Sequence, residues 1–393
     1  MIDKLLLPEV QKFIKDHQFD DPFLLSLHAK KSKTFPYKEA IEQIQSLQKA
    51  KTKHPVWAEK ENIIWPSPVS IEQSSSEVTA KYKTKLLQGD SMIDLTGGMG
   101  VDSCFFAGKF KRIDFVESDK HLCELAKHNF SVLGKNNINV HNDKAEDFID
   151  AYSCKVDAIY IDPSRRSAGK RVIKIQDYSP DLCGIIPKCK VISDQILVKL
   201  SPMVDLGLLI QNFKPTNIYV AAIKNEVKEV LCLIRHETLN PRIHAVDLDL
   251  NSGIISEFKF IYQNEARAKS EFSLPQKYLY EPNAAILKAG AFKLIGKHYG
   301  LKKLHQHTHL YTSDELVENF PGRIFMIKNQ IKGDKKEMAI LFPGRKANVI
   351  TRNYPLSASQ LKKKLGLQDG GDSFLLGTTQ LSGQKVLFLC VRI

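Results

Sequence analysis

A loop with three closely spaced glycines, in the sequence MIDLTGGMGVD at residues 92–102, constrains the fold of this chain more than any other feature. A short apolar run ends in Asp94, and a second apolar segment follows the loop. We expect a buried strand that turns sharply into a helix, because glycine adopts positive φ and lets a ligand lie against the backbone. The helix would point its free N–H groups at that ligand. Gly-rich turns of this kind serve several classes of ligand, so the downstream residues decide the class.

Three further apolar segments downstream of the loop also end in a carboxylate. Residues 112–117 end in Glu117, a run at 138–142 is followed by Asp143, and a run at 156–161 is followed by Asp162. The pattern predicts parallel strands that alternate with helices, and the carboxyl ends of such strands form the edge where open α/β sheets bind ligands. An acid at the tip of the second strand can accept both hydroxyls of a ribose, so we expect Glu117 to have that role.

This ordered series of motifs resembles the class I S-adenosylmethionine-dependent methyltransferases. The resemblance implies an α/β fold with a Rossmann-like sheet, which binds S-adenosylmethionine with the loop around its methionine part. It also implies Glu117 at the ribose, Asp143 near the adenine amino group and Asp162 facing the substrate. Thr96 stands where the family usually has its first glycine, a departure that looks like certain RNA methyltransferases. The cofactor-binding residues implied in this region are Asp94, Thr96, Gly97, Gly98, Gly100, Glu117, Ser118, Asp143 and Ala145.

A nicotinamide-binding sheet is the main rival interpretation of the same residues. Such a sheet requires glycines in G-x-G-x-x-G spacing, and residues 97–100 read Gly-Gly-Met-Gly instead. A dehydrogenase also has no need for an Asp-Pro pair after the fourth strand. The spacing therefore favours a methyltransferase over a dehydrogenase, and a sheet with ordinary turn residues is the simplest alternative to both.

The fourth strand leads into Asp162, Pro163 and Ser164, which we predict to be catalytic. Methyl transfer is an in-line attack, so the enzyme mainly positions the two reactants and keeps water away. When the nucleophile is an exocyclic amine, a hydrogen-bond acceptor such as Asp162 helps to localise the nitrogen lone pair, and Pro163 would stiffen the turn. Base N-methyltransferases usually have a second proline and an aromatic residue here. This chain has Ser164 and Arg165 instead, so the aromatic platform must come from elsewhere, with Tyr178 as the candidate.

Two other methyl acceptors are compatible with the same fold. Ribose 2′-O-methylation requires a lysine between carboxylates, and Lys199 would supply it if it points between Asp94 and Asp162. Cytosine C5 methylation requires a thiolate, commonly in a Pro-Cys or Thr-Cys pair, and neither pair occurs in this sequence. Base N-methylation is therefore favoured, and ribose methylation stays open.

The first 80 residues predict a helical region. Prolines at the expected starts mark the first two helices, and apolar residues at helical spacing predict a third over 37–53. The two tryptophans that follow are expected to pack in the core. In related methyltransferases the segment before the first strand packs over the cofactor, so Gln73 and Ser74 are candidate cofactor neighbours. The alternative for Ser74 is a capping box with Glu77 at a helix start.

The sequence pattern changes in the C-terminal part of the chain, after the predicted parallel strands. Residues 217–262 read as two hairpins, and the sequence Phe-Pro-Gly-Arg occurs twice, ending at Arg323 and at Arg345. With the segments at 280–283 and 352–356, this part resembles class I methyltransferases that have a small ferredoxin-like domain and a THUMP-like C-terminal domain. THUMP domains generally bind RNA. The predicted domains are an N-terminal helical region at 1–80, a methyltransferase domain at 81–265, a ferredoxin-like domain at 275–319 and a THUMP-like domain at 320–393, the last two being small α+β domains.

Positive charge is concentrated at the C-terminal end of the chain. The net charge is +13, and residues 321–393 alone carry thirteen Lys and Arg against four Asp and Glu. Each Lys or Arg that contacts a phosphate releases a condensed counterion, so we expect a polyanionic substrate, a structured RNA such as tRNA or rRNA. The alternative is that the charge only keeps a small domain in solution. The candidate substrate-binding residues are Arg165, Arg166, Lys199, Arg323 and Arg345.

Other features of the sequence bear on location and metal binding. No apolar run is long enough to span a bilayer, the N-terminus does not fit a signal peptide, and the seven cysteines contain no CxxC pair. We therefore expect a cytoplasmic protein with reduced thiols, no membrane partner and no metal. His305, His307 and His309 would face one side if they lie on a strand, but no carboxylate or cysteine accompanies them, so we expect an ordinary surface.

The sequence thus predicts a cytoplasmic RNA methyltransferase. A DNA adenine methyltransferase is the first alternative, favoured by the Asp-Pro motif but lacking a recognisable target-recognition domain. The second is a non-catalytic RNA-binding protein that keeps the sheet as a scaffold. The third is a small-molecule methyltransferase, which leaves the basic C-terminal end unexplained.

Overall fold

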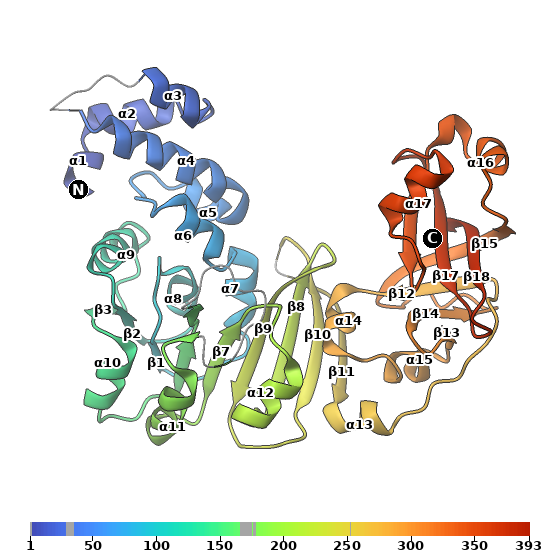
Figure 1. Ribbon diagram of the computed structural model, residues 1–393. Helices are drawn as coiled ribbons and strands as arrows, with labels where there is room; N and C mark the ends of the chain where they lie inside the picture. Colours follow the sequence, from blue (N-terminus) through green and yellow to red (C-terminus); the bar gives the residue numbers. More distant parts are fainter. Residues whose placement is uncertain (1, 29–34, 166–174, 176–177, 252) are drawn as a thin grey trace. The chain divides into compact units, whose positions relative to one another are not determined.

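The computed structural model describes residues 2–28, 35–165, 175, 178–251 and 253–393. The chain forms two compact units, which are described separately (Figure 1). The first unit comprises Met1–Asn217, Glu229–Leu239 and Asp249–Gly253, and the second comprises Ile218–Lys228, Asn240–Leu248 and Ile254–Ile393. The bounds of the four domains expected from the sequence stay a prediction.

The N-terminal part of the first unit is helical. Helix α4 covers Tyr37–Lys53, the range predicted from its apolar spacing, and it buries Ala40, Ile41 and Ile44. The other helices here are α1 (Ile2–Leu5), α2 (Pro8–Asp16), α3 (Pro22–His28), α5 (Pro55–Ala58), α6 (Pro68–Gln73) and α7 (Glu77–Lys83). Both α2 and α3 begin with proline, whose missing N–H is not needed at a helix start. None of the described helices of the chain combines the length and the apolar character of a membrane span.

Strands alternate with helices after α7. The parallel strands are β1 (Ser91–Asp94), β2 (Arg112–Glu117), β3 (Ile138–Asn142), β4 (Ala158–Ile161) and β7 (Ile196–Leu200). The connecting helices are α8 (Val101–Phe106), α9 (Lys120–Val132), α10 (Ala145–Ala151), α11 (Leu182–Ile192) and α12 (Leu206–Phe213). The strands β1 to β4 form in the segments where they were predicted, because a short apolar run bounded by polar turn residues marks each one.

Within the described residues this sheet has the strand order β11-β10-β8-β9-β7-β4-β1-β2-β3. Its remaining strands are β8 (Asn217–Ile223), β9 (Glu226–Ile234), β10 (Arg242–Leu248) and β11 (Ile254–Ile261). Strand β9 runs antiparallel to β7, and β10 and β11 form an antiparallel hairpin. Two short strands, β5 (Ser164–Arg165) and β6 (Tyr178–Ser179), pair with each other outside the sheet. The predicted α/β class with a Rossmann-like sheet is confirmed.

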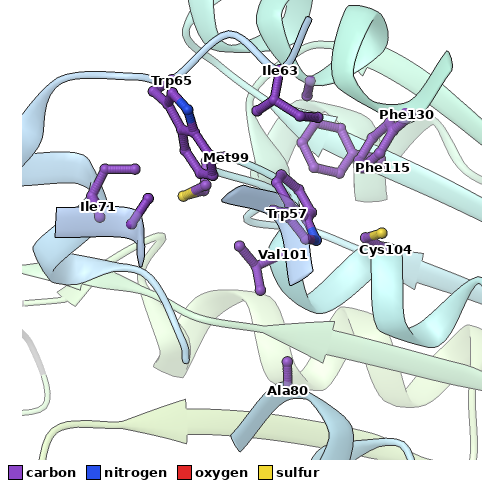
Figure 2. Close-up of a cluster of buried hydrophobic side chains, with 12 residues drawn as sticks. Trp57, Ile63, Trp65, Ile71, Ala80, Met99, Val101, Cys104, Phe115 and Phe130 are labelled. Carbon is purple, nitrogen blue, oxygen red and sulfur yellow. The ribbon is translucent and has the colours of Figure 1, made fainter. Parts of the chain in front are cut away.

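A cluster of buried side chains joins the N-terminal helices to the glycine loop, as Figure 2 shows. Trp57 and Trp65 are buried, as expected, and their ring centroids lie 6.4 Å apart. Met99 of the loop belongs to the same cluster as Phe115 of β2 and Phe130 of α9. The helical region and the glycine loop therefore share one hydrophobic core.

The second unit contains a seven-stranded sheet in the order β13-β14-β12-β15-β18-β17-β16 among its described residues. Its strands are β12 (Tyr278–Pro282), β13 (Lys302–His305), β14 (Thr308–Ser313), β15 (Gly322–Ile331), β16 (Asn348–Arg352), β17 (Ser373–Thr379) and β18 (Lys385–Arg392). Its helices are α13 (Tyr262–Arg267), α14 (Ala284–Ala289), α15 (Leu294–Tyr299), α16 (Lys335–Leu341) and α17 (Ala358–Leu365), of which α17 packs on β16 (Figure 1). Strand β12 pairs with β15, so the two small domains predicted from the sequence contribute to one continuous sheet.

His305, His307 and His309 lie on a hairpin. His305 ends β13, His307 lies in the turn and His309 lies in β14. The ring of His309 stacks on Phe292 with 3.7 Å between the centroids. The condition for a common face, a single strand, is therefore not met, because the chain reverses between the first and the third histidine. Among the described residues, no group of three or more His, Cys, Asp or Glu side chains is arranged to hold a metal ion.

Candidate active site

The glycine loop connects β1 to α8, and its glycines have two different surroundings. A Cβ at Gly97 would lie 2.2 Å from the ring of Phe115, and one at Gly100 would lie 2.5 Å from the ring of Phe130. Gly100 also has a φ of 87° and caps α8. Gly98 has a φ of 56°, and a Cβ built there has no neighbour within 4 Å. The core therefore excludes side chains at the first and third glycines, while the middle one faces open space.

Glu117, at the end of β2, lies next to the middle of this loop. Its Oε2 accepts the N–H of Gly98 at 2.8 Å, and its Oε1 accepts the N–H of Asp119 at 2.8 Å. The exposed Ser118 donates its hydroxyl to Oε1 at 3.3 Å. The half-buried carboxylate is thus held against the loop, in the position that sequence reasoning assigned to the ribose-binding acid.

The tip of β3 adjoins the tip of β2. The N–H of Asp143 donates to the carbonyl oxygen of Glu117 at 3.2 Å, and the Asp143 Oδ1 accepts the N–H of Lys144 at 2.8 Å. Ala145 is buried and begins α10. The predicted cofactor residues from β1, β2 and β3 therefore lie at one edge of the sheet.

Asp94 is enclosed rather than open to a ligand. Its residue surface is 1% exposed, its Oδ2 accepts the hydroxyl of Ser103 at 2.6 Å, and its Oδ1 accepts the N–H of Thr96 at 3.1 Å. Burial raises the pKa of this carboxyl to about 7, although both hydrogen bonds act in the opposite direction. Asp94 thus fixes β1 to α8 and shapes the loop from inside.

Thr96, the residue that departs from the usual glycine, has a clear contact. Its hydroxyl oxygen accepts the N–H of Asp162 at 2.5 Å. This hydrogen bond joins the glycine loop to the turn after β4, which a glycine could not do because it has no hydroxyl. The departure that the sequence left without a physical reason therefore fixes the proposed cofactor loop to the proposed catalytic residue.

Lys199, on β7, forms an ion pair with Asp162 through Oδ2. Burial disfavours the charged ammonium, but the carboxylates of Asp162, Asp102 and Glu229 outweigh it and raise the pKa of Lys199. Asp94, the other carboxylate of the expected group, has its oxygens bonded to Ser103 and Thr96. The role of Lys199 in ribose methylation stays a prediction.

The other residues of the Asp162 motif differ in how far the structure describes them. Pro163 is buried, and the exposed Ser164 donates its hydroxyl to the carbonyl oxygen of Ser179 at 3.3 Å. Arg166 lies outside the described residues, as does the side chain of Arg165. Tyr178 is only 2% exposed, so the expectation that it offers an open stacking platform is wrong, because its ring is already buried.

Sequence reasoning missed a group of buried charges behind Asp162. The group comprises Lys83 from α7, Asp102 from α8 and Glu229 from β9, with Ser75 and Tyr160 bonded to it. Glu229, an acid that comes just before the apolar run 230–234 of β9, was a signal that could have indicated it. The partners of that residue lie far away along the sequence, so their meeting was not predictable.

The segment before β1 does not form the predicted capping box. Helix α7 is capped by Ser76, whose hydroxyl oxygen accepts the N–H of Thr79 at 3.3 Å. Ser74 contacts Nε2 of His54 at 2.9 Å, and Gln73 is exposed at the end of α6. The capping box with Glu77 is wrong because the helix begins two residues later than it requires. The role of Gln73 and Ser74 as cofactor neighbours stays a prediction.

In the second unit, Arg323 is already paired inside the protein. The Glu281 side chain, 3% exposed, accepts Arg323 through Oε2 and Arg352 through Oε1. Arg345 is exposed and ends the 3₁₀ turn Pro343–Arg345. The two Phe-Pro-Gly-Arg copies therefore place their arginines differently, and Arg352 is a basic residue that the sequence did not single out.

Two family descriptions match the C-terminal part of the chain, and one solved structure matches nearly the whole chain. The family described as a ferredoxin-like domain matches residues 278–321, and the family described as THUMP domain-like matches residues 322–392. A crystal structure from Porphyromonas gingivalis W83, provisionally described as a methyltransferase, is 31% identical with a TM-score of 0.86. It covers 98% of this chain and 97% of that chain.

Two relatives among the curated proteins extend these matches. An uncharacterised S-adenosylmethionine-dependent methyltransferase of Mycobacterium tuberculosis (strain ATCC 25618 / H37Rv) is 20% identical over 311 residues, which are 76% of this chain and 80% of the relative. An uncharacterised RNA methyltransferase of Thermotoga maritima is 28% identical over 159 residues, 39% of this chain and 36% of that protein. The first similarity extends over most of this chain, and the second is confined to a part of it.

Proposed function

This chain belongs to the class I S-adenosylmethionine-dependent methyltransferases that have ferredoxin-like and THUMP-like domains, and from that premise we propose that it methylates RNA. The observation that carries the proposal is the charge of residues 321–393, with thirteen Lys and Arg against four Asp and Glu. Phosphates are the groups that such a surface binds best. The name of the Thermotoga maritima relative supports the same class of substrate.

The cofactor is S-adenosylmethionine, which supplies the electrophilic methyl group. We propose that the glycine loop holds its methionine part, since the open space at Gly98 is what a ligand lying against the backbone requires. Glu117 would bind the ribose hydroxyls and Asp143 the adenine edge. The contacts of Glu117 with Gly98 and with Asp143 keep these groups adjacent, which a ligand of this size needs.

Asp162 would act on the substrate side. Its Oδ2 is paired with Lys199, which leaves Oδ1 to accept an N–H of an exocyclic base amine and to localise the nitrogen lone pair. Its backbone is fixed to the loop through Thr96, so the acceptor is oriented before the substrate binds. We favour base N-methylation for this reason.

A ribose 2′-hydroxyl is the second candidate acceptor, and the Lys199–Asp162 ion pair is the observation that favours it. A hydroxyl must lose its proton on methylation, and a carboxylate beside an ammonium can take that proton while the ammonium donates to the oxygen. Mass spectrometry of the nucleosides from methylated RNA separates the two, because the added mass stays with the base in one case and with the sugar in the other.

The first experiment titrates the purified protein with S-adenosylmethionine in a calorimeter, beside Gly98→Asp. The new carboxylate would occupy the open space at the loop, so we expect micromolar binding in the wild type and none in the variant. Gly134→Asp is the matched control, because Gly134 also has a positive φ (66°) and no neighbour within 4 Å of its Cβ. Equal binding by wild type and Gly98→Asp would contradict the assignment of the loop.

The second experiment incubates the protein and tritiated S-adenosylmethionine with RNA from cells in which its gene is deleted. Label in RNA that is absent with Gly98→Asp supports the proposal. Label in DNA from the same cells would instead support a DNA methyltransferase. Cofactor binding with label in neither polymer would favour a small-molecule substrate, and no cofactor binding would favour a non-catalytic scaffold.

A further inference from the structure

Three enclosed charged side chains lie behind the Asp162–Lys199 ion pair. Lys83 is fully buried, and the side chains of Asp102 and Glu229 are 9% and 2% exposed. They come from α7, α8 and β9, so only the folded chain brings them together. We call Lys83, Asp102 and Glu229 the buried charge cluster.

Lys83 is the centre of this cluster. Its Nζ donates to Oδ1 of Asp102 at 2.8 Å and to the hydroxyl of Ser75 at 2.6 Å, and it lies 3.2 Å from Oε2 of Glu229. The Asp102 Oδ2 accepts the hydroxyls of Ser75 at 2.7 Å and of Tyr160 at 2.8 Å. Both oxygens of Asp102 and the ammonium of Lys83 therefore have partners inside the protein.

The cluster is connected to the catalytic turn through strand β4. Tyr160 precedes Asp162 by two residues and donates its hydroxyl to Asp102, while its carbonyl oxygen accepts the N–H of Leu95. Asp162 itself donates its N–H to Thr96. The end of β4 is thus held on one side by the glycine loop and on the other by the cluster.

Burying these charges is energetically costly, and a packed apolar group in the same space is often as stable or more stable. A requirement for stability alone therefore does not account for the cluster. The electrostatic effect of the cluster on Lys199 gives another reason. The carboxylates of Asp102 and Glu229 raise the pKa of Lys199, in addition to interacting with Lys83. Lys83 thus contacts Asp102 and Glu229, whereas Lys199 contacts Asp162, the carboxylate that we place on the substrate side.

The two carboxylates of the cluster differ in how strongly their ionised form is stabilised. Burial would raise the pKa of Asp102, but Lys83 and Lys199 more than offset it and the pKa is lowered. Burial raises the pKa of Glu229 despite the same two lysines. Asp102 is therefore the firmer anion of the two, and it is the one that would compete with Asp162 for Lys199 if Lys83 were absent.

We propose that Lys83 is a positioning residue for methyl transfer: by pairing with Asp102 and Glu229 it leaves Lys199 to Asp162, and so keeps the Asp162 carboxylate oriented toward the substrate. This inference rests on the proposed role of Asp162. Lys83 itself need not touch the cofactor or the substrate.

The first test needs no substrate. In protein labelled with ¹⁵N-lysine, enclosed ammonium groups exchange slowly and give separate NMR signals, and Lys199→Arg identifies the signal of Lys199. We expect Lys83→Met to shift that signal, since Lys199 then moves toward Asp102. Lys111→Met is the matched control, because Lys111 forms an exposed ion pair with Asp90 at 2.7 Å. An unshifted Lys199 signal in folded Lys83→Met would overturn the proposal.

The second test measures methyl transfer to RNA from the deletion strain. Displacement of a positioned group typically costs about 10- to 100-fold in rate, so we expect that loss in kcat for Lys83→Met with the KM for S-adenosylmethionine unchanged. Lys83→Met combined with Asp102→Asn removes the competing anion as well, and we expect it to recover most of the lost kcat. A structural role alone predicts a lower Tm with kcat intact, or a loss that the double variant does not recover.

The proposal can still be tested if Lys83→Met does not fold or if the wild type methylates no RNA. If Lys83→Met does not fold, Ser75→Ala replaces it, because that substitution removes one hydrogen bond from Lys83 and one from Asp102. A smaller shift of the Lys199 signal is then expected, and no shift would again overturn the proposal. If the wild type methylates no RNA, the proposed function fails, and the NMR result still decides whether Lys83 controls the pairing of Lys199.

Discussion

Two clusters of buried charge, one in each unit, have opposite designs. In the buried charge cluster a lysine is enclosed by carboxylates, and Lys83 and Glu229 are 0% and 2% exposed. In the second unit a carboxylate is enclosed by arginines. Glu281 is 3% exposed there, whereas Arg323 and Arg352 are 28% and 42% exposed.

The difference in exposure decides what each cluster can do. Fully enclosed charges interact strongly, because neither water nor salt ions reach them to screen the interaction. Removing one such charge therefore changes the electrostatic energy of its neighbours. Charges at the surface are screened, and their pairs contribute less. The first cluster is therefore suited to controlling the charge and orientation of the proposed catalytic groups. The second is suited to joining β12, β15 and β16 while guanidinium groups remain accessible to phosphate.

The largest effect is expected where the first cluster meets the substrate side. Asp162→Ala removes the proposed acceptor, and loss of such a group lowers turnover by about 10²- to 10⁴-fold. Lys199 keeps Asp102 and Glu229 as counter-charges, so we expect cofactor affinity within a few-fold of the wild type. Single-turnover methylation of RNA and calorimetry with S-adenosylmethionine measure the two quantities.

Asp194→Ala is the control for this substitution, since it removes an exposed carboxylate just before β7. It should change neither quantity. If Asp162→Ala loses cofactor binding and turnover in parallel, Asp162 belongs to the cofactor side, and the first cluster would then support cofactor binding instead of the methyl acceptor.

A second prediction uses Asp94, an enclosed carboxyl to which no cation is bonded among the described residues. Because burial raises its pKa from 3.8 to about 7, the folded protein retains a proton that the unfolded chain releases between these values. The free energy of unfolding therefore falls as the pH rises through this window, by up to about 1.4 kcal/mol per pH unit, and levels off above it. Asp94→Asn should lack this component.

Urea unfolding of the wild type and of Asp94→Asn at pH 5, 6, 7 and 8 tests the sign. Asn can still accept one hydrogen bond through its oxygen, so the variant should fold. Parallel pH profiles for the two proteins would mean that Asp94 is ionised throughout, and that enclosure without a cation does not distinguish it from Asp102.

The sheet was predictable from the sequence because its signals are local. Each of the strands β1 to β4 is a short run that ends in an acid or is followed by one. Glu117, Asp143 and Asp162 could therefore be placed at one edge, where the carboxyl ends of parallel strands meet. The glycine pattern was predictable for the same reason. The structure adds that the three glycines have different surroundings, with Gly98 facing open space and Gly97 and Gly100 facing the core.

The buried charge cluster was not predictable because its signals are not local. Lys83 and Glu229 lie 146 positions apart along the chain, and their pairing depends on the antiparallel placement of β9 beside β7. The contact of Thr96 with Asp162 has the same character. Similarly, the hairpin that separates His305 from His309 depends on a turn with no glycine or proline to mark it.

The smallest effect is expected in the second cluster. Glu281→Gln leaves two guanidinium groups without their counter-charge, but both are partly exposed and can be hydrated. We therefore expect a loss of about 1–2 kcal/mol in the free energy of unfolding. Removing one partner of a fully enclosed pair costs about 3–5 kcal/mol. Urea unfolding measures the loss, and Glu226→Gln, which removes an exposed carboxylate paired with Lys228, should change it by less than about 0.5 kcal/mol. A loss for Glu281→Gln as large as that for Lys83→Met would mean that the arginines are held as tightly as the enclosed lysine, and they would then not be free to bind phosphate.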